Sequence, residues 1–400
     1  MNRRRFLKNC GALSTALAAP RFHQNTDPGW NVVILQLSGG NDGLSTVIPH
    51  GDDDYHNARK STRHAASSAL RIDEYRGLHP DLKHLQRAWD EGQLGIIEGV
   101  GYEGNTRSHF RSMEVWHTAR TDGRKSGDGW IGRLGQVEWS ARSTSERVAH
   151  LGSRLPYSVY SGSKPTIAME SPTSYRWFGK PRGEGFFSKV AGLEPHALQA
   201  ANHGRDQSLA RIRSLLAEAE QTSDRIRASA LRYQTDVKYP HSVLGANLHD
   251  AAAILQAGLG TRVISMEFTG FDTHAGQMQR HNGLMRKLDS ALGAFLKDLQ
   301  RSDVGRKTVV LVFSEFGRRF AENGSGGTDH GNAGPAFVLG PGIKGGLFGA
   351  HPSLNELDEG GDLKVTTDFR SLYATLLERA LGVQQEAVLG ARYPLLGFLV

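Results

Sequence analysis

The stretch NVVILQLSGGNDG, residues 31–43, decides the fold that we expect for this chain. Its first seven residues form a nearly continuous apolar run, which predicts a buried strand of a parallel sheet. The turn-rich residues SGGNDG follow at once and predict that the strand ends in a loop. Ligand and catalytic groups collect where the strands of an α/β sheet end, so Asp42 in this loop is a candidate metal ligand. The alternative is an ordinary turn, because the same residue types are frequent in turns.

Strand-like and helix-like segments alternate along the rest of the chain. Further strands are predicted at residues 93–100, 261–268, 308–313 and 335–339, and the clearest helices at residues 81–91, 249–259, 277–300 and 368–381. This alternation predicts an α/β fold with a mostly parallel sheet and helices on both of its faces. We find no repeat and no long linker in the 400 residues. We therefore expect a single domain over residues 28–398, with a partly helical insertion at roughly 135–245.

The first twenty residues have the order of a twin-arginine signal peptide. The sequence RRRFLK, residues 3–8, places two arginines before a variable residue and the triplet FLK, and a weakly apolar stretch follows from Cys10 to Ala19. The sequence ALA at residues 16–18 resembles a cleavage site, and the apolar stretch is too short to span a bilayer. We expect export by the twin-arginine machinery to the periplasm or the exterior. The alternative is a basic N-terminal helix that remains attached.

Removal of this segment changes the interpretation of the charge and of the cysteine content. It takes away four basic residues and no acidic residue, which lowers the formal net charge from +7 to +3. That balance is weak support for nucleic-acid binding, and no basic stripe interleaved with aromatic residues is present. The only cysteine, Cys10, leaves with the segment, and the residues before it are a poor lipoprotein signal. We expect neither a nucleic-acid partner nor a stable membrane anchor.

Asp272 and His274 lie in a loop after the strand predicted at residues 261–268. With one residue between them, the two side chains can point the same way if the segment is extended. A carboxylate and an imidazole are suitable ligands for a divalent metal. The alternative is a helix-capping aspartate with a histidine at the surface.

A second pair of the same kind lies in the glycine-rich stretch GTDHGNA, residues 327–333. Asp329 and His330 can offer one oxygen and one nitrogen to a metal, and the flanking glycines let the backbone bend tightly around it. Glu315 directly follows the strand predicted at residues 308–313. It is either a further ligand or the ion-pair partner of a nearby arginine.

Three residues are candidates for the chemistry itself. Ser108 lies at the expected start of a helix, where a hydroxyl close to a metal can act as a nucleophile. The alternative is a plain N-cap serine. Arg107 and Arg318 are candidates to neutralise a transferring anionic group, because a guanidinium can contact such a group through two hydrogen bonds.

The order of these motifs resembles that of a known family. The sequences LSGGNDG, RSHF, GFDTH, SEFGR and GTDHGNA follow one another between Asn31 and Leu381. In this respect the chain is similar to the secreted bacterial family catalogued as domain of unknown function 1501, whose activity is uncharacterised. That family is placed in the alkaline-phosphatase-like superfamily, with phosphatases, sulfatases and cofactor-independent phosphoglycerate mutases. The resemblance implies an alkaline-phosphatase-like α/β fold.

The resemblance also implies one or two divalent metal ions, for which we expect Zn, Mn, Mg or Ca. On the superfamily pattern, Asp42 matches the early aspartate and Ser108 the nucleophile, while Asp329 and His330 match the Asp-His pair. That pair is expected directly after its strand, where this chain has Glu315, so either Glu315 or Asp329 takes the ligand position.

We therefore expect an exported metal-dependent hydrolase of phosphate or sulfate esters, acting on a small-molecule or glycan ester through Ser108. The alternative is a non-catalytic exported metal- or glycan-binding protein of the same fold. A mutase or transferase would share the same site. The enzymatic expectation requires six side chains to meet at one cation-binding pocket. They are Asp42, Asp272, His274, Glu315, Asp329 and His330.

Overall fold

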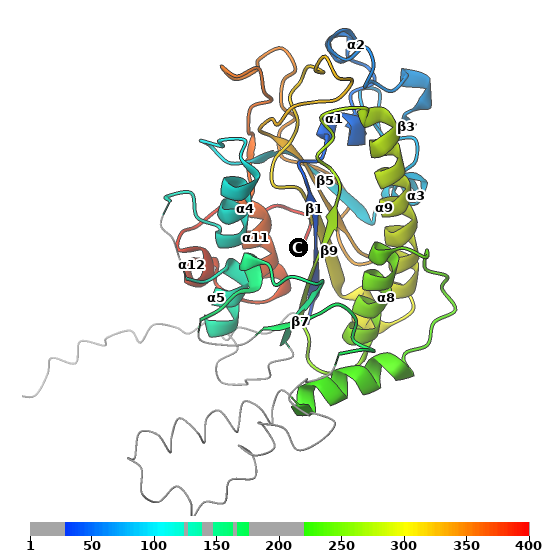
Figure 1. Ribbon diagram of the computed structural model, residues 1–400, viewed down its shortest axis with the longest axis vertical. Coiled ribbons are helices and arrows are strands. Elements are labelled where there is room, and N and C mark those ends of the chain that lie inside the picture. Colours follow the sequence, from blue (N-terminus) through cyan, green and yellow to red (C-terminus); the bar gives the residue numbers. More distant parts are fainter. Residues whose placement is uncertain (1–28, 124–126, 138–146, 163–165, 176–219, 400) are drawn as a thin grey trace, which may run out of the picture.

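The computed structural model describes residues 29–123, 127–137, 147–162, 166–175 and 220–399 (Figure 1). The expected signal peptide at residues 1–20, with Cys10, lies outside these ranges, as do large parts of the expected insertion at 135–245. Within the described ranges, none of the helices has the length and apolar content that crossing a membrane requires.

A sheet of nine strands forms the centre of the described part of the chain. Its order is β11-β5-β10-β9-β1-β8-β6-β7, and β12 pairs with β5. The strands are β1 (Asn31–Ser38), β5 (Leu94–Gly101), β6 (Val148–Leu151), β7 (Ile167–Met169), β8 (Val263–Thr269), β9 (Thr308–Phe313), β10 (Gly334–Leu339), β11 (Gly346–Phe348) and β12 (Thr367–Asp368). The pairings are parallel except those of β10, which runs antiparallel to both β5 and β9. The prediction of a mostly parallel α/β sheet is confirmed.

Strand β1 is buried along its whole length because both of its faces carry apolar side chains. Val33 and Leu35 pack into the core on one face of the sheet, and Val32 and Ile34 pack into the core on the other. In register, Val32 lies opposite Val263 of β8. The apolar run at residues 31–37 therefore becomes an interior strand, as its composition predicted.

Two layers of helices cover the two faces of the sheet, as expected (Figure 1). One layer holds α3 (Lys83–Asp90), α8 (Val243–Gln256) and α9 (Gln277–Leu299), and the other holds α4 (His109–Thr118), α5 (Trp130–Val137), α11 (Arg370–Thr375) and α12 (Gln385–Leu389). Helix α11 continues as a π-helical turn, η5, over Leu376–Ala380. The long helix α9 is amphipathic and buries Leu288, Leu292 and Phe295 in the core.

Shorter elements complete the described chain. They are α1 (Gly43–Thr46), α2 (Asp53–Ala58), α10 (Asp303–Arg306), the 3-10 turns η1 (Ala66–Ser68) and η3 (Tyr157–Val159), and a small sheet of β2 (Val47–Ile48), β4 (Gly77–Leu78) and β3 (Leu70–Arg71). Strands β6 and β7 lie within the expected insertion, yet they extend the main sheet beyond β8.

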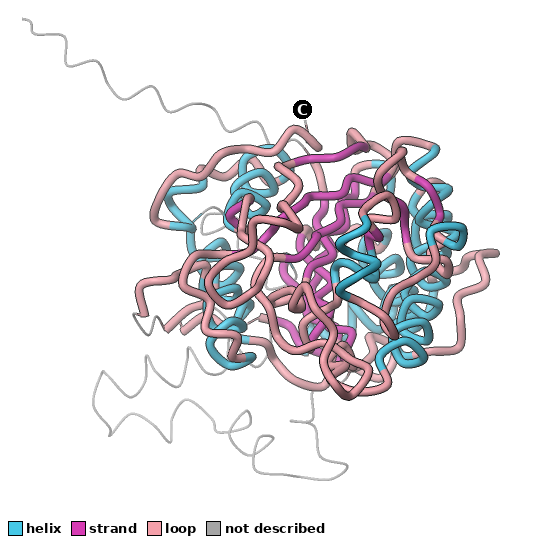
Figure 2. The backbone as a smooth tube through the Cα atoms, turned by 90° about the horizontal axis from the view of Figure 1, so that it is seen from above, coloured by secondary structure: helices cyan, strands magenta, loops and turns pink. Residues whose placement is uncertain are grey.

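The carboxyl ends of β1, β8 and β9 lie at one edge of the sheet because these strands run parallel. Loops gather over this edge (Figure 2). The Phe271 amide donates to the Ser38 carbonyl at 3.2 Å, and the Gly39 amide donates to Glu315 Oε1 at 2.8 Å. Gly39 has a φ of 123°, and a Cβ there would lie 2.4 Å from the Asp272 nitrogen, so only glycine permits this close approach.

Candidate metal centre

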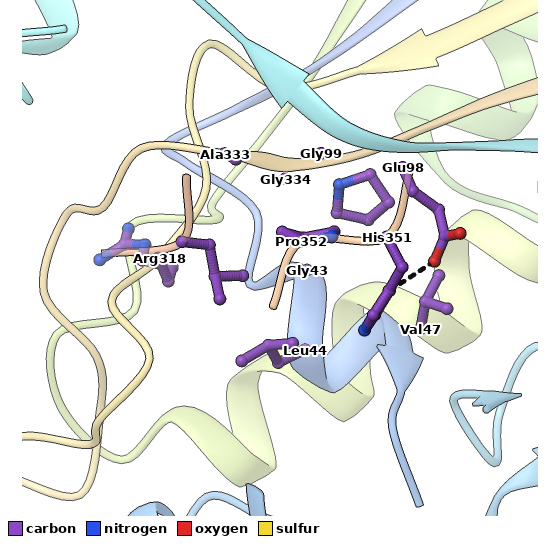
Figure 3. Close-up of a pocket in the computed structure, with 12 residues that line it drawn as sticks. Gly43, Leu44, Val47, Glu98, Gly99, Arg318, Ala333, Gly334, His351 and Pro352 are labelled. Atoms are coloured by element: carbon purple, nitrogen blue, oxygen red, sulfur yellow. Dashed lines mark hydrogen bonds and ion pairs between the residues drawn. The ribbon is translucent and has the colours of Figure 1, made fainter. Parts of the chain in front are cut away.

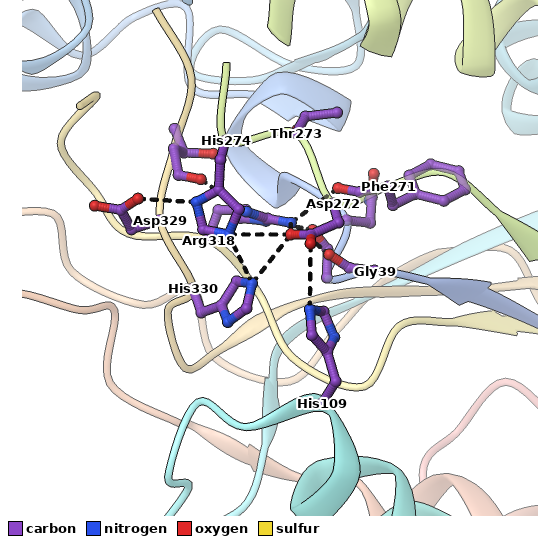
Figure 4. A network of polar contacts seen from close by, with 12 residues as sticks. Gly39, His109, Phe271, Asp272, Thr273, His274, Arg318, Asp329 and His330 are labelled. Carbon is purple, nitrogen blue, oxygen red and sulfur yellow. Dashed lines mark hydrogen bonds and ion pairs between the residues drawn. The ribbon is translucent and has the colours of Figure 1, made fainter. Parts of the chain in front are cut away.

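Asp272 lies at the centre of a group of histidine side chains over this edge (Figure 4). Its side chain is 49% exposed. Its Oδ1 atom lies 3.0 Å from His330 Nε2, 3.1 Å from His274 Nε2 and 2.8 Å from Arg318 Nη2. Its Oδ2 atom lies 3.6 Å from His109 Nε2. Three imidazoles therefore converge on one carboxylate, and all three present the same ring nitrogen to it.

The other ring nitrogen of each histidine is held by an acceptor. The Nδ1 atoms of His109, His274 and His330 lie 2.8, 2.9 and 2.9 Å from Glu315 Oε1, Asp329 Oδ1 and the Arg107 carbonyl, respectively. Carboxylates and carbonyls accept hydrogen bonds, so Nδ1 carries the proton in each ring. Each Nε2 atom is then left with its lone pair directed at the centre. Metal-binding histidines are oriented by the same kind of outer hydrogen bond.

This arrangement fits a divalent cation. His274 Nε2 and His330 Nε2 lie 2.9 Å apart, so two lone pairs would face each other beside a carboxylate. A cation between them converts that repulsion into attraction, and imidazole and carboxylate are ligands that zinc and related metals accept. Donor atoms of His109, Asp272 and His330 all lie within 4.8 Å of one another. Burial also lowers the pKa of His330, which keeps its ring neutral and able to bind a metal.

Glu315 orients a histidine and does not face the centre. Its side chain is fully buried. Oε1 accepts from the Gly39 amide and from His109 at 2.8 Å each, and Oε2 accepts from Ser314 at 3.2 Å. The hydrogen bond to Glu315 raises the pKa of His109, although partial burial acts in the opposite direction. The structure does not bring Glu315 to the centre, where it was expected as a ligand, and its carboxylate instead positions His109 and the loop after β1.

Asp329 has the corresponding position behind His274. Its Oδ1 atom accepts from His274 Nδ1 at 2.9 Å and from Asn323 Nδ2 at 3.0 Å, and these hydrogen bonds lower its pKa. The Asp329-His330 pair thus supplies one residue that faces the centre and one that supports a neighbour. Only His330 of the expected pair faces the centre, because Asp329 contacts the outer nitrogen of His274.

Arg318 connects the loops of the site through hydrogen bonds to their backbone carbonyls. Its buried guanidinium donates to the carbonyls of Gly40 at 2.6 Å, Thr328 at 2.7 Å and Phe271 at 3.0 Å, and also to that of Gly39. It also donates to Asp272. Partial burial raises the pKa of Asp272, but the hydrogen bond and the positive charge of Arg318 outweigh it and lower that pKa to about 2. With its donors so engaged, Arg318 is an anchor of the site and not the free anion-binding group that we expected.

Arg107 also differs from the expected role. Its Nη2 atom lies 2.6 Å from Asp362 Oδ2, and the Asp362 side chain is fully buried. Its backbone has a φ of 59°, a left-handed conformation that is costly for a residue with a side chain. In this conformation its carbonyl accepts from His330, and its amide donates to Asn105 Oδ1 at 2.9 Å. The Arg107 guanidinium is thus committed to Asp362, while the backbone positions a histidine.

Asp42 does not join the histidines. Its carboxylate is fully buried and forms an ion pair with Arg59 Nη1 at 2.5 Å. Oδ2 also accepts from Ser45 at 2.7 Å and from Gln277. Burial raises the pKa of Asp42, but Arg59 overcomes this effect and holds the pKa well below its usual range. The structure does not bring Asp42 to the centre, where it was expected as a ligand, and a buried guanidinium already balances its charge.

Ser108 lies at the N-cap of α4, between Arg107 and His109 in sequence. The Arg107 carbonyl accepts from His330 Nδ1, and the His109 ring faces Asp272. The Ser108 hydroxyl makes no capping hydrogen bond to α4. The plain N-cap role that we considered is therefore absent, and the hydroxyl stays a candidate nucleophile.

A small cavity lies beside α1, the start of β10 and the segment around His351 (Figure 3). It is lined mainly by apolar groups, among them Leu44, Val47 and Pro335, and by Glu98 and His351, which share a hydrogen bond of 2.7 Å. Its volume is about 30 Å³, enough for a small number of water molecules. It is too small to hold a substrate.

The structure thus brings together Asp272, His274 and His330 of the expected ligands and adds His109. His109 stands in the RSHF motif but was not among the predicted ligands. The available signal was its place at the start of a helix, one residue after the candidate nucleophile. That signal is weak, because one imidazole near a helix start has many possible roles.

Comparisons with other proteins place the chain among uncharacterised relatives. The family described as "Protein of unknown function (DUF1501)" matches residues 189–391. Among the curated proteins, no match to the chain was found.

Three solved structures to which the chain is similar are distant. A protein in the alkaline phosphatase superfamily from Vibrio parahaemolyticus shares 11% identity at a TM-score of 0.41, with 90% of this chain and 68% of that chain covered. A putative sulfatase from Bacteroides thetaiotaomicron shares 10% at 0.37, with 79% and 65% covered. The lipoteichoic acid synthase LtaP from Listeria monocytogenes shares 10% at 0.37, with 90% and 74% covered. The chemistry of the site therefore has to be argued from this chain's own residues.

Proposed function

The chain belongs to the family described as Protein of unknown function (DUF1501), and from that premise we propose that it is a metal-dependent hydrolase of phosphate or sulfate esters. The observation that carries the proposal is the convergence of three Nε2 atoms on Asp272, with each Nδ1 proton held by an acceptor. A site built only for stability would not need three imidazoles turned toward one carboxylate, because the facing lone pairs of His274 and His330 repel one another.

His109, Asp272, His274 and His330 would hold one divalent cation. Such a cation supplies Lewis-acid stabilisation of negative charge on the ester oxygens. The described residues support one ion, since Asp42 is paired with Arg59. A second ion is not needed by the proposal.

Ser108 is the proposed nucleophile. Its position at the amino end of α4 places its hydroxyl where the helix dipole favours developing negative charge. Its Oγ atom would form a bond to phosphorus or sulfur while the bond to the leaving alcohol breaks. The hydroxyl proton leaves to solvent, the alcohol oxygen takes a proton, and water then hydrolyses the serine ester.

A non-catalytic metal- or glycan-binding protein is the second candidate. It is favoured by the engagement of both expected anion-binding arginines. Arg318 is bonded to backbone carbonyls and Asp272, and Arg107 is paired with Asp362. In this alternative the cation would be retained and Ser108 would have no chemical role.

The decisive experiment uses the purified chain and three variants. We expect the wild type to hold about one divalent metal ion per chain by elemental analysis. We also expect it to hydrolyse p-nitrophenyl phosphate or p-nitrophenyl sulfate when supplied with Zn²⁺ or Mn²⁺. His330→Ala should lose both metal and activity, Ser108→Ala should keep the metal and lose activity, and the exposed His241→Ala should change neither.

The outcomes separate the two candidates. Wild-type protein that binds metal but is inert toward both esters would favour the binding protein. Protein that binds no divalent metal would contradict the hydrolase and the metal-binding form of the second candidate, and would leave only glycan binding. Activity that survives in Ser108→Ala would remove the serine from the mechanism and leave a water as the attacking group.

We also propose export by the twin-arginine pathway, on the basis of residues 3–8. Replacing Arg3 and Arg4 together by lysine should keep the full-length chain in the cytoplasm. Cell fractionation of the bacterial host measures this. Unchanged export of the double variant would contradict the proposal.

A further inference from the structure

A cavity of about 260 Å³ lies between the sheet and the helix layer that contains α4. It is lined by side chains of β1, β6, β8 and β9, of α4 and α5, and of the loop after β6. This volume approaches the lower end of the roughly 300 Å³ and above that small-molecule pockets occupy. It is far larger than the cavity beside Glu98 and has room for one ring-sized group.

Polar side chains lie on a sheet face that is otherwise apolar. On β1, Gln36 follows Ile34 on the same face, and Ser265 of β8 and His150 of β6 lie on that face too. Gln36 is 8% exposed, and Ser265 and His150 are 4% exposed each. Ser265 Oγ and His150 Nδ1 lie 2.9 Å apart and satisfy each other within the protein, whereas Gln36 keeps hydrogen-bonding capacity at the cavity.

Gln36 and His117, which both line the cavity, each retain hydrogen-bonding capacity. His117 Nε2 lies 2.9 Å from Gln36 Oε1, so the ring nitrogen donates to the amide oxygen. The Gln36 amide nitrogen is then a donor and His117 Nδ1 an acceptor, and the described residues supply neither with a hydrogen bond. A donor and an acceptor side by side match the two functions of a hydroxyl group.

The interior of the cavity is uncharged. Burial lowers the pKa of His117 and that of His150 to about 4, so both rings are neutral at pH 7. The charged lining residues, Arg154 and Glu267, are exposed at the rim. Trp130 and Tyr373 add aromatic surface, with their rings stacked at 4.3 Å. A neutral ligand with hydroxyl groups and an apolar ring face suits this lining.

The cavity adjoins the candidate metal centre through α4. His109 contacts Asp272, while Met113 and His117, one and two turns further along the same helix face, line the cavity. One helical turn rises about 5.4 Å, so the first cavity residue lies close behind the centre. Phe313, the last residue of β9, lines the cavity, and Glu315, two residues later, supports His109.

We propose that this cavity binds one neutral sugar unit, which forms the alcohol part of the ester that is cleaved at the metal centre. The inference rests on the proposed function for the cleavage, but binding of the sugar stands on the cavity alone. It assigns a glycan ester as the substrate class. Gln36 and His117 would bind a hydroxyl, and Trp130 would face the ring.

The test measures binding of unreactive sugars to the full chain, so it does not depend on hydrolysis. Methyl glycosides of galactose, glucose, mannose and fucose would be examined one at a time by saturation-transfer NMR. We expect at least one of them to bind. Gln36→Leu, which removes the amide, and Ser265→Leu, which fills the cavity, should each weaken that binding about tenfold or more.

A matched control is Leu231→Ala, a change at an exposed residue that does not line the cavity. Circular dichroism and thermal unfolding would show whether each variant is folded, and two different cavity variants guard against the misfolding of one. Absence of binding by all four glycosides would overturn the inference. Equal binding by the wild type and both folded cavity variants would overturn it as well.

The results also distinguish the two proposals. Protein that binds a glycoside but hydrolyses no ester retains the sugar site and loses the hydrolase. Protein that hydrolyses p-nitrophenyl esters but binds no glycoside retains the hydrolase, and the cavity then holds only water.

Discussion

His109 illustrates how the role of a residue depends on both of its polar atoms. Its Nδ1 atom is bound to a buried carboxylate, Glu315, and its Nε2 atom faces Asp272. Either contact alone would be an ordinary ion pair of moderate strength. Together they orient the ring and leave a lone pair at the centre, which is how proteins prepare an imidazole for a metal.

The first residue-scale prediction concerns the carboxylate behind His109. Glu315→Gln keeps the shape but weakens the acceptor for the Nδ1 proton, so the ring is held less firmly. We expect metal affinity to fall roughly 10–100-fold, the usual effect of removing an outer partner. Competition with a chelator of known affinity measures the change. The exposed Glu356→Gln is the control, and unchanged affinity in Glu315→Gln would contradict our assignment.

The second residue-scale prediction concerns the strained backbone of Arg107, whose φ is 59°. Both Arg107→Ala and Arg107→Gly remove the ion pair with Asp362, but only glycine adopts this φ without strain. We expect the glycine variant to be the more stable of the two by about 1 kcal/mol. Chemical denaturation of both proteins measures the difference. An alanine variant of equal or greater stability would show that the conformation is not strained.

At the scale of elements, helix α4 joins the two sites that we propose. Its first residue faces the candidate metal centre, and its later turns line the cavity beneath it. Strand β1 also contributes to both sites. Its residue Gln36 lines the cavity, and Gly39, in the turn that follows the strand, contacts Glu315, the carboxylate behind His109. In these two proposals, α4 and the β1 segment each contribute both to the cavity and to the candidate centre.

Buried His150, on the sheet, leads to a prediction about how the free energy of unfolding depends on pH. Burial lowers the pKa of His150 to about 4, whereas an exposed histidine titrates near 6.5. Between these values the unfolded chain binds the additional proton, so the free energy of unfolding falls as the pH drops from about 6.5 to 4. His150→Gln should reduce this loss by on the order of 2–3 kcal/mol at pH 4.

Denaturant unfolding at pH 7 and at pH 4 measures the effect in the wild type and the variant. His79, His117 and His281 have lowered pKa values as well, so the wild type should remain acid-sensitive after one replacement. The exposed His241→Gln serves as the comparison. A His150→Gln protein with the same pH dependence as the wild type would show that this ring is protonated when folded.

For the whole molecule, the candidate centre ties together segments that are far apart in the chain. His109, Asp272 and His330 come from three separate regions, and Arg318 already connects their loops. A bound cation would add a further link that exists only in the folded state. Binding to the native state alone raises stability by mass action.

We therefore expect removal of the metal to lower the melting temperature. Treatment with a chelator should lower the melting temperature, and added Zn²⁺ should restore it. The shift should be several degrees if the metal is present at about 100 times its Kd. Differential scanning fluorimetry measures both shifts. The melting temperature of His330→Ala should respond to neither treatment. A wild-type protein whose melting temperature changes with neither chelator nor metal would contradict a native metal site.

Much of this architecture was determined by the sequence alone. The apolar run at residues 31–37 could only be an interior strand, and the alternation of strands and helices required a mostly parallel sheet. Because parallel strands end at one edge, the loops with Asp272, Glu315 and His330 had to come close together. The family resemblance, now confirmed by the match over residues 189–391, rested on the same motifs.

The roles of the individual residues were decided only by the tertiary structure. Carboxylates and guanidiniums act over a few ångströms, and whether they face a metal or each other depends on neighbours distant in sequence. Asp42 pairs with Arg59, Arg107 with Asp362, and Glu315 with His109. The last of these pairs joins residues more than 200 positions apart, beyond what local patterns in one sequence can show. Strand order thus determined which loops meet, whereas side-chain packing determined which atoms face the centre.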